Sequence, residues 1–212
     1  MKNIIFIAPP AAGKGTQSQM LKEKYGYIHI STGDLLRAEI ASGSTLGLEV
    51  KNIIDKGHLV NDDLMIDIIK KKLADIKGKP FILDGFPRTL NQAQILDDLL
   101  SDDYEVVYLD LDKEVAIARI EGRLTCSCGK SYNLGDVELQ PKVAGVCDNC
   151  GKKLIKRDDD NAEAFIVRYD TFLNNTKVLV DYYKDKNKLH IVDVNRNIND
   201  IFKDISEIVA ND

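Results

Sequence analysis

Short apolar runs rich in β-branched residues alternate along this chain with segments whose apolar residues recur at helical spacing. Apolar runs without polar interruption are typical of strands buried on both faces of a parallel sheet. Parallel strands separated by helices form right-handed βαβ units. We therefore predict an α/β fold with a doubly wound, five-stranded parallel sheet. The predicted strands lie at residues 4–7, 28–30, 81–83, 106–109 and 190–192.

Several of the intervening segments have recognisable helix ends. The first helical pattern stops at Gly26, a residue typical of helix C-caps. Asp160, followed three residues later by Glu163, resembles a capping box at the start of a long helix. Three shorter helices are predicted at residues 15–25, 89–100 and 113–121. The long helix carries an apolar stripe that we expect to pack in the core: Phe165, Ile166, Tyr169, Phe172, Leu173, Leu179, Val180 and Tyr183.

Two stretches break the alternation of strands and helices. Residues 31–60 have helical patterns without an obvious strand, and residues 122–160 hold all four cysteines among scattered Gly, Lys and Asp. Both stretches are interpreted as inserts on the doubly wound sheet, whose strand carboxyl ends are where such folds bind ligands. The predicted core then comprises residues 1–30, 61–121 and 161–212.

The composition narrows the possible classes of protein. A net charge of −5 and 44% hydrophobic residues are ordinary for a globular chain and exclude a disordered one. The acidic balance counts against a nucleic-acid partner and a basic membrane-surface protein. No run approaches the roughly 18 apolar residues of a membrane span, and the apolar opening breaks at Pro9 and Pro10, unlike a signal peptide. We expect a cytoplasmic monomer whose cysteines are metal ligands or free thiols.

The segment between the first predicted strand and the first predicted helix is typical of a phosphate-binding loop. It reads Ala8-Pro9-Pro10-Ala11-Ala12-Gly13-Lys14-Gly15-Thr16. Backbone N–H groups at such a turn form an anion cradle, Lys14 adds positive charge at the β- and γ-phosphates, and the Thr16 hydroxyl offers a ligand to Mg²⁺. The match to G-x-x-x-x-G-K-[ST] is imperfect, because Ala8 replaces the first glycine and Gly15 separates Lys14 from Thr16. The alternative is a plain turn with an exposed lysine.

A second motif follows the strand at residues 81–83 and reads Asp84-Gly85-Phe86-Pro87-Arg88-Thr89. Asp84 stands at the carboxyl end of a strand, where it can orient Mg²⁺ through water, and Arg88 can clamp a phosphate bidentately. The alternatives are a turn residue and a solvated charge. Thr89-x-x-Gln92 also fits a capping box, which would give Gln92 a purely structural role.

A third motif reads Ser31-Thr32-Gly33-Asp34-Leu35-Leu36-Arg37. A purely structural interpretation is a helix capped by Ser31 with Arg37 in solvent.

Arginines elsewhere in the chain are candidates for contacts with phosphates. If the phosphates bound by these motifs are transferred, the reaction requires positioning and charge neutralisation, so several arginines converging on the phosphates are expected. Arg119 and Arg123 are spaced so as to share one helix face, and Arg157 and Arg168 are further candidates; all four could instead be surface charges. His29 and His190 flank apolar residues and are predicted to be structural.

The four cysteines form two closely spaced pairs. Cys126-x-Cys128 and Cys147-x₂-Cys150 are each followed by glycine, which is nearly the spacing of a Cys₄ zinc site. A small insert with little core gains stability from such a metal. The first pair is one residue shorter than the usual C-x₂-C, and Asp136 and Asp148 are possible replacement ligands. Free thiols are the alternative.

Together the three motifs and the cysteine pairs resemble the adenylate kinases of the long-lid bacterial type, over nearly the whole chain. That family's loop is G-x-P-G-x-G-K-G-T, so Ala8 and Ala11 stand where it has glycines, and alanine adds strain wherever the backbone needs a positive φ. The resemblance implies a P-loop NTPase fold with a helical monophosphate-binding insert and a small zinc-ribbon-like lid. It implies the reversible reaction of Mg-ATP with AMP to give two ADP.

The resemblance also implies roles for individual residues. Catalysis falls to Lys14, Arg88, Arg123, Arg157 and Arg168. ATP is held by Ala11, Ala12, Gly13, Lys14, Gly15, Thr16, Arg119, Arg123, Ser131, Tyr132 and Arg196. AMP is held by Thr32, Arg37, His58, Leu59, Val60, Gly85, Phe86, Pro87, Arg88, Gln92, Arg157 and Arg168, with Gly57 in the same wall as His58. Zn²⁺ is bound by Cys126, Cys128, Cys147 and Cys150, and Mg²⁺ by Asp84 through water.

Two other functions are compatible with parts of the sequence. A related kinase acting on UMP, CMP or GMP differs from an AMP kinase in pocket shape, although Thr32 and Gln92 favour AMP. A zinc-ribbon nucleic-acid-binding module would explain the cysteines, but the net charge of −5 and the two phosphate motifs count against it.

Overall fold

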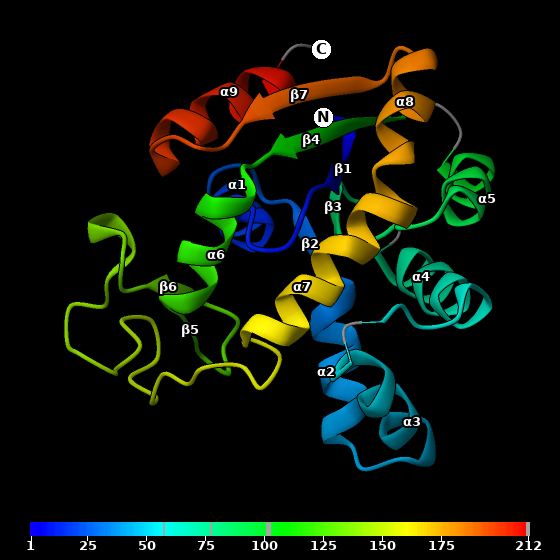
Figure 1. Cartoon of the computed structure of the whole chain (residues 1–212). Helices are drawn as coiled ribbons and strands as arrows, with labels where there is room; N and C mark the ends of the chain where they lie inside the picture. The colour runs from blue at the N-terminus through cyan, green and yellow to red at the C-terminus, as the bar shows by residue number, and fades with distance from the viewer. Residues whose placement is uncertain (57, 77, 101–102, 211–212) are drawn as a thin grey trace.

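The computed structural model describes residues 1–56, 58–76, 78–100 and 103–210. A five-stranded sheet in the order β2-β3-β1-β4-β7, parallel throughout, crosses the centre of the molecule, as predicted (Figure 1). Its strands are β1 (Asn3–Ile7), β2 (Ile28–Ser31), β3 (Phe81–Asp84), β4 (Tyr104–Asp110) and β7 (Leu189–Asp193).

Helices cover both faces of the sheet. The α-helices are α1 (Lys14–Tyr25), α2 (Thr32–Ala41), α3 (Thr45–Ile54), α4 (Asp62–Ile76), α5 (Leu90–Leu100), α6 (Lys113–Glu121), α7 (Ala162–Thr171), α8 (Val178–Asp185) and α9 (Ile198–Ala210). Alternate strand residues face opposite sides, so Ile5 joins a core with α4, α5 and α8, whereas Ile4 joins one with α1, α6 and α9. This two-layer burial explains why the strands are uninterrupted apolar runs.

The strand register gathers the ends of three strands at one edge of the sheet. Asp84 is opposite Phe6 on one side and Ser31 on the other. The phosphate-binding loop, the loop after β3 and the start of α2 therefore leave the sheet side by side. The position of β3 between β1 and β2 is the reason that these three sequence motifs meet there.

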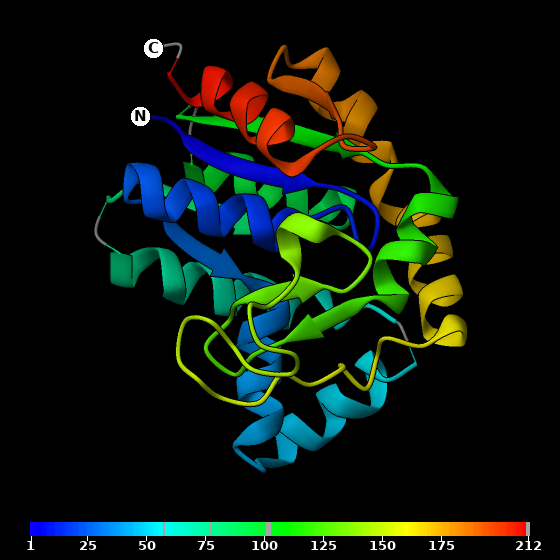
Figure 2. The same ribbon diagram turned by 90° about the vertical axis from the view of Figure 1, so that its left-hand side faces the viewer.

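Helices α2 and α3 form a hairpin that projects from this edge (Figures 1 and 2). Ser31 caps α2 by accepting a hydrogen bond from the Asp34 N–H at 3.2 Å, and Ser44 caps α3 through the Gly47 N–H at 2.9 Å. The two helices cross closely at Gly47, where an added Cβ would lie 2.4 Å from the Glu39 carbonyl oxygen. A glycine is therefore needed at this crossing.

Residues 123–160 form a small separate layer beside the cleft edge (Figure 2). It contains the antiparallel pair β5 (Arg123–Thr125) and β6 (Ser131–Asn133) and the short 3₁₀ helix η1 (Val137–Leu139). A core of four buried residues, Cys126, Tyr132, Cys147 and Leu154, holds it together. So small a core is consistent with the expected need for a metal.

The C-terminal helical segment departs from the prediction at its start. The N-cap is Asn161, whose side chain accepts from the Ala164 N–H at 2.8 Å, so the predicted capping box of Asp160 with Glu163 is wrong. Asp160 is instead 3% exposed and paired with Arg123. Between α7 and α8 lies a π-helical turn, η2 (Phe172–Thr176), which the apolar stripe did not predict.

Within the described part of the chain, no helix combines the length and the apolar character that crossing a lipid bilayer requires.

The helix crossing at Gly47 yields a stability prediction. Gly47→Ala should lower the free energy of unfolding by about 1–3 kcal/mol through overpacking, despite the roughly 1 kcal/mol that alanine gains in a helix. Urea unfolding measures the change, and Glu49→Ala on the exposed side of α3 is the matched control. Equal or greater stability of Gly47→Ala would contradict the close crossing.

Candidate active site

A cleft of ≈ 350 Å³, open to solvent, lies at the carboxyl edge of the sheet. Its walls come from the phosphate-binding loop, the start of α2, the end of β3 and the 123–160 segment. A narrower recess of ≈ 60 Å³ continues from it and shares Pro10, Lys14, Arg88 and Arg168. The structure thus brings most of the predicted site residues together around one opening.

The loop before α1 has the geometry of an anion cradle. Gly13 caps α1 in the left-handed region at φ +85°, with Lys14 as the first helical residue, and residues 10–16 all line the cleft. The N-terminus of α1 therefore presents free N–H groups and the positive end of the helix dipole. Ala11 also has a positive φ, +67°, so the strain expected of an alanine here is present; Ala8 is not among the positive-φ residues.

Lys14 faces a carboxylate and several cations. Burial lowers the pKa of Lys14 to about 8; Asp84 acts in the opposite direction, and Arg88 and Arg168 lower it further. The Asp84 carboxylate lies 3.3 Å from Nε2 of His29. Burial acts to raise the pKa of Asp84, but the contact with His29 and the charge of Lys14 outweigh it and hold that pKa below its usual range. The positive charge of Lys14 can therefore bind an anion in the cleft, and the negative charge of Asp84 can bind a cation.

His29 was predicted to be structural, and its position adds a contact with the site. It lines the cleft and touches Asp84 across the β2–β3 pairing. The sequence signal for this contact was the position of His29 near the carboxyl end of a predicted strand. His190 lies elsewhere, 2.9 Å from a carboxylate oxygen of Glu105.

Arg88 is anchored through its backbone and its side chain. Its N–H donates to Oε1 of Gln92 at 2.8 Å, and its Nε donates to the Gly85 carbonyl at 2.7 Å. Burial, followed by repulsion from Arg168, lowers the pKa of Arg88 to about 10. Gly85 has φ +86°, and an added Cβ would lie 2.5 Å from Oγ1 of Thr32, so only glycine fits this turn.

The cleft concentrates positive charge. Six arginines line it together with Lys14: Arg37, Arg88, Arg119, Arg123, Arg157 and Arg168. The predicted shared helix face of Arg119 and Arg123 is wrong, because α6 ends at Glu121 and Arg123 begins β5. Burial, followed by the charge of Arg123, lowers the pKa of Arg157 to about 10. Arg119 donates to the Val194 carbonyl at 2.7 Å.

Two aspartates that sequence reasoning missed balance these arginines. Asp160 accepts from Nε of Arg123 at 2.8 Å, and Asp159 accepts from Nη1 of Arg168 at 2.8 Å. Burial opposes ionisation of Asp159, but Arg168 and Arg123 lower its pKa overall. The run Asp158-Asp159-Asp160 directly after Arg157 was the available signal. The carboxylates of Asp159 and Asp160 therefore form ion pairs with the guanidinium groups of Arg168 and Arg123, which a phosphate would otherwise contact.

The residues predicted to hold a monophosphate nucleotide are distributed unevenly. Arg37 lines the cleft and pairs with Asp34 at 2.6 Å. Leu59, Gly85, Pro87 and Arg88 line the recess. Thr32, Val60, Phe86 and Gln92 are buried behind these surfaces. Of the described residues, His58 is exposed and lies outside both linings, and Gly57 lies outside the described residues.

Gln92 has a structural role in this state. Its Nε2 donates to Asp62 at 2.7 Å while its Oε1 accepts from Arg88, and Thr89 Oγ1 accepts from the Gln92 N–H at 3.2 Å. Thr89 therefore caps α5, but the reciprocal bond of the predicted box goes to Arg88 instead. Both ends of the Gln92 side-chain amide therefore make hydrogen bonds within the protein.

Of the residues predicted to hold ATP beyond the phosphate-binding loop, some line the cleft and one does not. Ser131 and Tyr132 line the cleft beside Arg119 and Arg123. Arg196 is absent from the lining of both cavities in the described structure, and its guanidinium contacts Asp204 at 2.5 Å.

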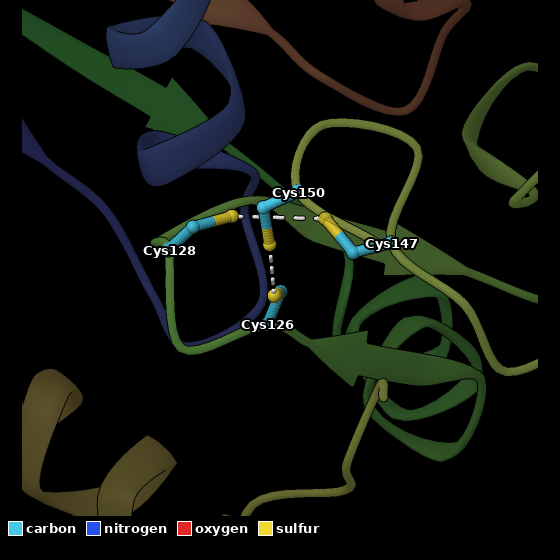
Figure 3. Close-up of side chains that lie close together, drawn as sticks. All are labelled: Cys126, Cys128, Cys147 and Cys150. Atoms are coloured by element: carbon cyan, nitrogen blue, oxygen red, sulfur yellow. Dashed lines mark hydrogen bonds between the residues drawn. The ribbon is translucent and has the colours of Figure 1, made fainter. Parts of the chain in front are cut away.

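The four cysteines converge, as Figure 3 shows. Their sulfur atoms all lie within 4.8 Å of one another, and two of the contacts, Cys126–Cys150 and Cys128–Cys147, measure 3.4 and 3.6 Å. A tetrahedral ion with ligands at 2.3 Å separates its sulfurs by about 3.8 Å, so this donor set fits a metal. The shortened Cys126-x-Cys128 pair does not prevent convergence.

The possible replacement ligands have other partners. Asp148 accepts from the Lys142 N–H at 3.0 Å, and Asp136 accepts from the Glu138 N–H at 3.0 Å. Tyr132 connects the cluster to the cleft wall: its hydroxyl donates to Sγ of Cys147 at 3.4 Å and accepts from the Asp148 N–H at 2.7 Å.

A doubly wound sheet with this loop and this ring of cations defines a P-loop phosphotransferase. The sequence model of the Adenylate kinase family matches residues 6–188. Adenylate kinases of Clostridium tetani and Methanosarcina acetivorans are 42% and 45% identical to this chain, and the alignment with each covers 98% of both chains. That of Archaeoglobus fulgidus is 43% identical over 98% of this chain and 97% of its own. The chain therefore belongs to the adenylate kinase family and is a nucleoside monophosphate kinase.

The positive φ of Ala11 predicts that glycine substitutions at two neighbouring alanines change the free energy of unfolding in opposite directions. Ala11→Gly should raise the free energy of unfolding by up to about 1 kcal/mol, because the left-handed conformation costs alanine more than glycine loses in chain entropy. The matched control is Ala12→Gly, which should lose about 1 kcal/mol because Ala12 is buried without a positive φ. Urea unfolding of nucleotide-free protein compares the two; destabilisation by both would contradict the strain.

Proposed function

We propose that this chain transfers the γ-phosphoryl group of Mg-ATP to AMP, reversibly, giving two ADP. The observation that carries the proposal is the ring of Lys14 and six arginines around one cleft, next to an anion-binding helix N-terminus. Two nucleotides facing each other through their phosphates bring a large negative charge into so positive a site. The alignment with adenylate kinases along nearly the whole chain supports the same reaction.

The proposed ATP site is built on the phosphate-binding loop. Residues 11–16 hold the phosphates through N–H groups, and Lys14 adds its charge at the β- and γ-phosphates. Arg119, Ser131 and Tyr132 border the adenosine, and Arg123 reaches the phosphates. Arg196 contacts the nucleotide only if it gives up its ion pair with Asp204.

The proposed AMP site is built around Arg88 and Arg37, which bind the phosphate. Thr32, Leu59, Val60, Gly85, Phe86 and Pro87 form its walls, with His58 at the rim. Gln92 reads the adenine edge only by giving up a contact with Asp62 or Arg88. Arg157 and Arg168 lie between the two sites and neutralise the transferred group.

The chain needs no general base, because the attacking AMP oxygen is already anionic. Its residues align the two phosphate tails, neutralise charge in the transition state and exclude water. We propose that residues 31–60 and 122–160 close over a core of residues 1–30, 61–121 and 161–212. Asp84, through water, and Thr16 would hold Mg²⁺, since both line the cleft. When bound, Mg²⁺ would supply charge neutralisation at the phosphate oxygens.

We also propose that the four-cysteine cluster holds Zn²⁺ in a structural role. Four thiolates suit Zn²⁺, and the metal would stabilise a segment whose core has only four buried residues. A cytoplasmic location fits these cysteines, because a reducing medium keeps them as thiols. A monomer is proposed on the net charge of −5.

A coupled assay tests the reaction. The protein with ATP and Mg²⁺ should phosphorylate AMP faster than UMP, CMP or GMP, and omission of Mg²⁺ should abolish turnover. Lys14→Met should lose about 10²–10³-fold in kcat while its thermal unfolding stays near that of the parent, because one charged donor to the transition state is gone. Preference for another monophosphate, or near-normal turnover of Lys14→Met, would contradict the proposal.

Metal analysis tests the zinc proposal. The purified protein should carry about one Zn²⁺ per chain, and Cys150→Ser should lose most of it and unfold at lower temperature, since one of four ligands is missing. Ser127→Ala, an exposed change between two ligands, is the control and should keep the metal. Absence of metal from the parent and both variants would end the idea.

A further inference from the structure

The π-helical turn η2 places a threonine against the phosphate-binding arginine. Thr176, the last residue of η2, is 6% exposed, and its Oγ1 donates to the carbonyl oxygen of Arg88 at 2.9 Å. The two residues are far apart in sequence, and both line the recess. This contact joins the C-terminal helical segment to the loop after β3.

The wide turn has a geometric consequence. The Lys177 N–H donates to the Phe172 carbonyl at 2.9 Å, five residues back, and this bond closes η2. Residues eight apart in an uninterrupted α-helix differ by about 80° in direction, and a wider turn takes up part of that rotation. Arg168 and Thr176 are eight apart, yet both line the recess. The π turn therefore makes the angle between Arg168 and Thr176 smaller than in an uninterrupted α-helix.

Arg88 needs anchoring that does not depend on charge. Before a phosphate is bound, Arg168 and Arg37 repel its guanidinium, Asp84 attracts it, and Lys14 lines the same recess. Three hydrogen bonds oppose this repulsion: from the Arg88 N–H to Gln92, from Nε to Gly85 and from Thr176 to the carbonyl. With its N–H, its carbonyl and its Nε all engaged, the backbone of Arg88 and the inner part of its guanidinium are held in place.

We propose, on the basis of the AMP site described above, that Thr176 is a positioning residue for Arg88. The Thr176 hydroxyl fixes the Arg88 backbone so that the guanidinium meets the phosphate of AMP without prior reorganisation. Thr176 lines the recess beside Arg88 but not the cleft that we assign to ATP. In this proposal it acts on AMP through Arg88. Its loss therefore weakens AMP binding selectively.

Thr176→Val tests this role, because valine has nearly the shape of threonine and lacks the hydroxyl. We expect the KM and the calorimetric Kd for AMP to rise by up to about tenfold, with the KM for ATP unchanged within about twofold. Thr176→Ser keeps the hydroxyl and should restore the AMP values.

The matched control is Thr171→Val. Thr171 lines the same recess on the same helical segment, but its hydroxyl donates to the Val167 carbonyl of its own helix at 2.7 Å. This variant should leave AMP and ATP constants within about twofold of the parent, since no bond to Arg88 is lost. Thermal unfolding of all three variants separates folding defects from positioning.

The outcomes separate the two proposals. An AMP Kd of Thr176→Val equal to that of the parent overturns the positioning role, and so does an equal loss for ATP and AMP or an equal loss in Thr171→Val. Failure of the parent to phosphorylate AMP overturns the proposed reaction instead. In that case the calorimetric affinity for AMP still decides the role of Thr176, and absence of AMP binding overturns both.

Discussion

Repulsion among positive charges at one edge of the sheet is the constraint on which the rest of this structure depends. Lys14, Arg88 and Arg168 share a recess, and four more arginines border the cleft beside it. Partial burial makes each of these charges harder to keep, as the lowered pKa values of Lys14 and Arg88 show. Such a group persists only where carboxylates and fixed backbone dipoles hold it.

The fold supplies both kinds of restraint. Asp84 enters from the end of β3, and Asp159 and Asp160 enter from the segment before α7, so the counter-charges come from two distant parts of the chain. Backbone carbonyls of Gly85 and Val194 hold Arg88 and Arg119. Because the carboxylates pair with the groups that phosphates would bind, substrate exchanges one set of anions for another at little cost in desolvation.

Much of this arrangement was predictable from the sequence. All five strands of the sheet were predicted to within two residues at each end, because buried parallel strands leave uninterrupted apolar runs. The phosphate loop, the Asp84–Thr89 motif and the cysteine pairs were predictable because their chemistry needs particular residue types at short spacing.

Other features were not predictable, because they depend on contacts across the fold. The π-helical turn carries no distinct apolar pattern, so Thr176 and its contact with Arg88 were invisible. Asp160 had the sequence environment of a helix cap, yet its burial beside Arg123 decided its role. The positive φ of Ala11 follows from the close turn and overrides the preference of alanine itself.

The strand order also determines when the site can assemble during synthesis. β1 leaves the ribosome first, but its neighbours β3 and β4 begin only at Phe81 and Tyr104, and β7, the last strand, begins at Leu189. The nascent phosphate loop therefore emerges long before the strands that flank it. Pairings of such long sequence separation form slowly. Until they form, the cationic cleft does not exist, and the growing chain has no place to hold a nucleotide.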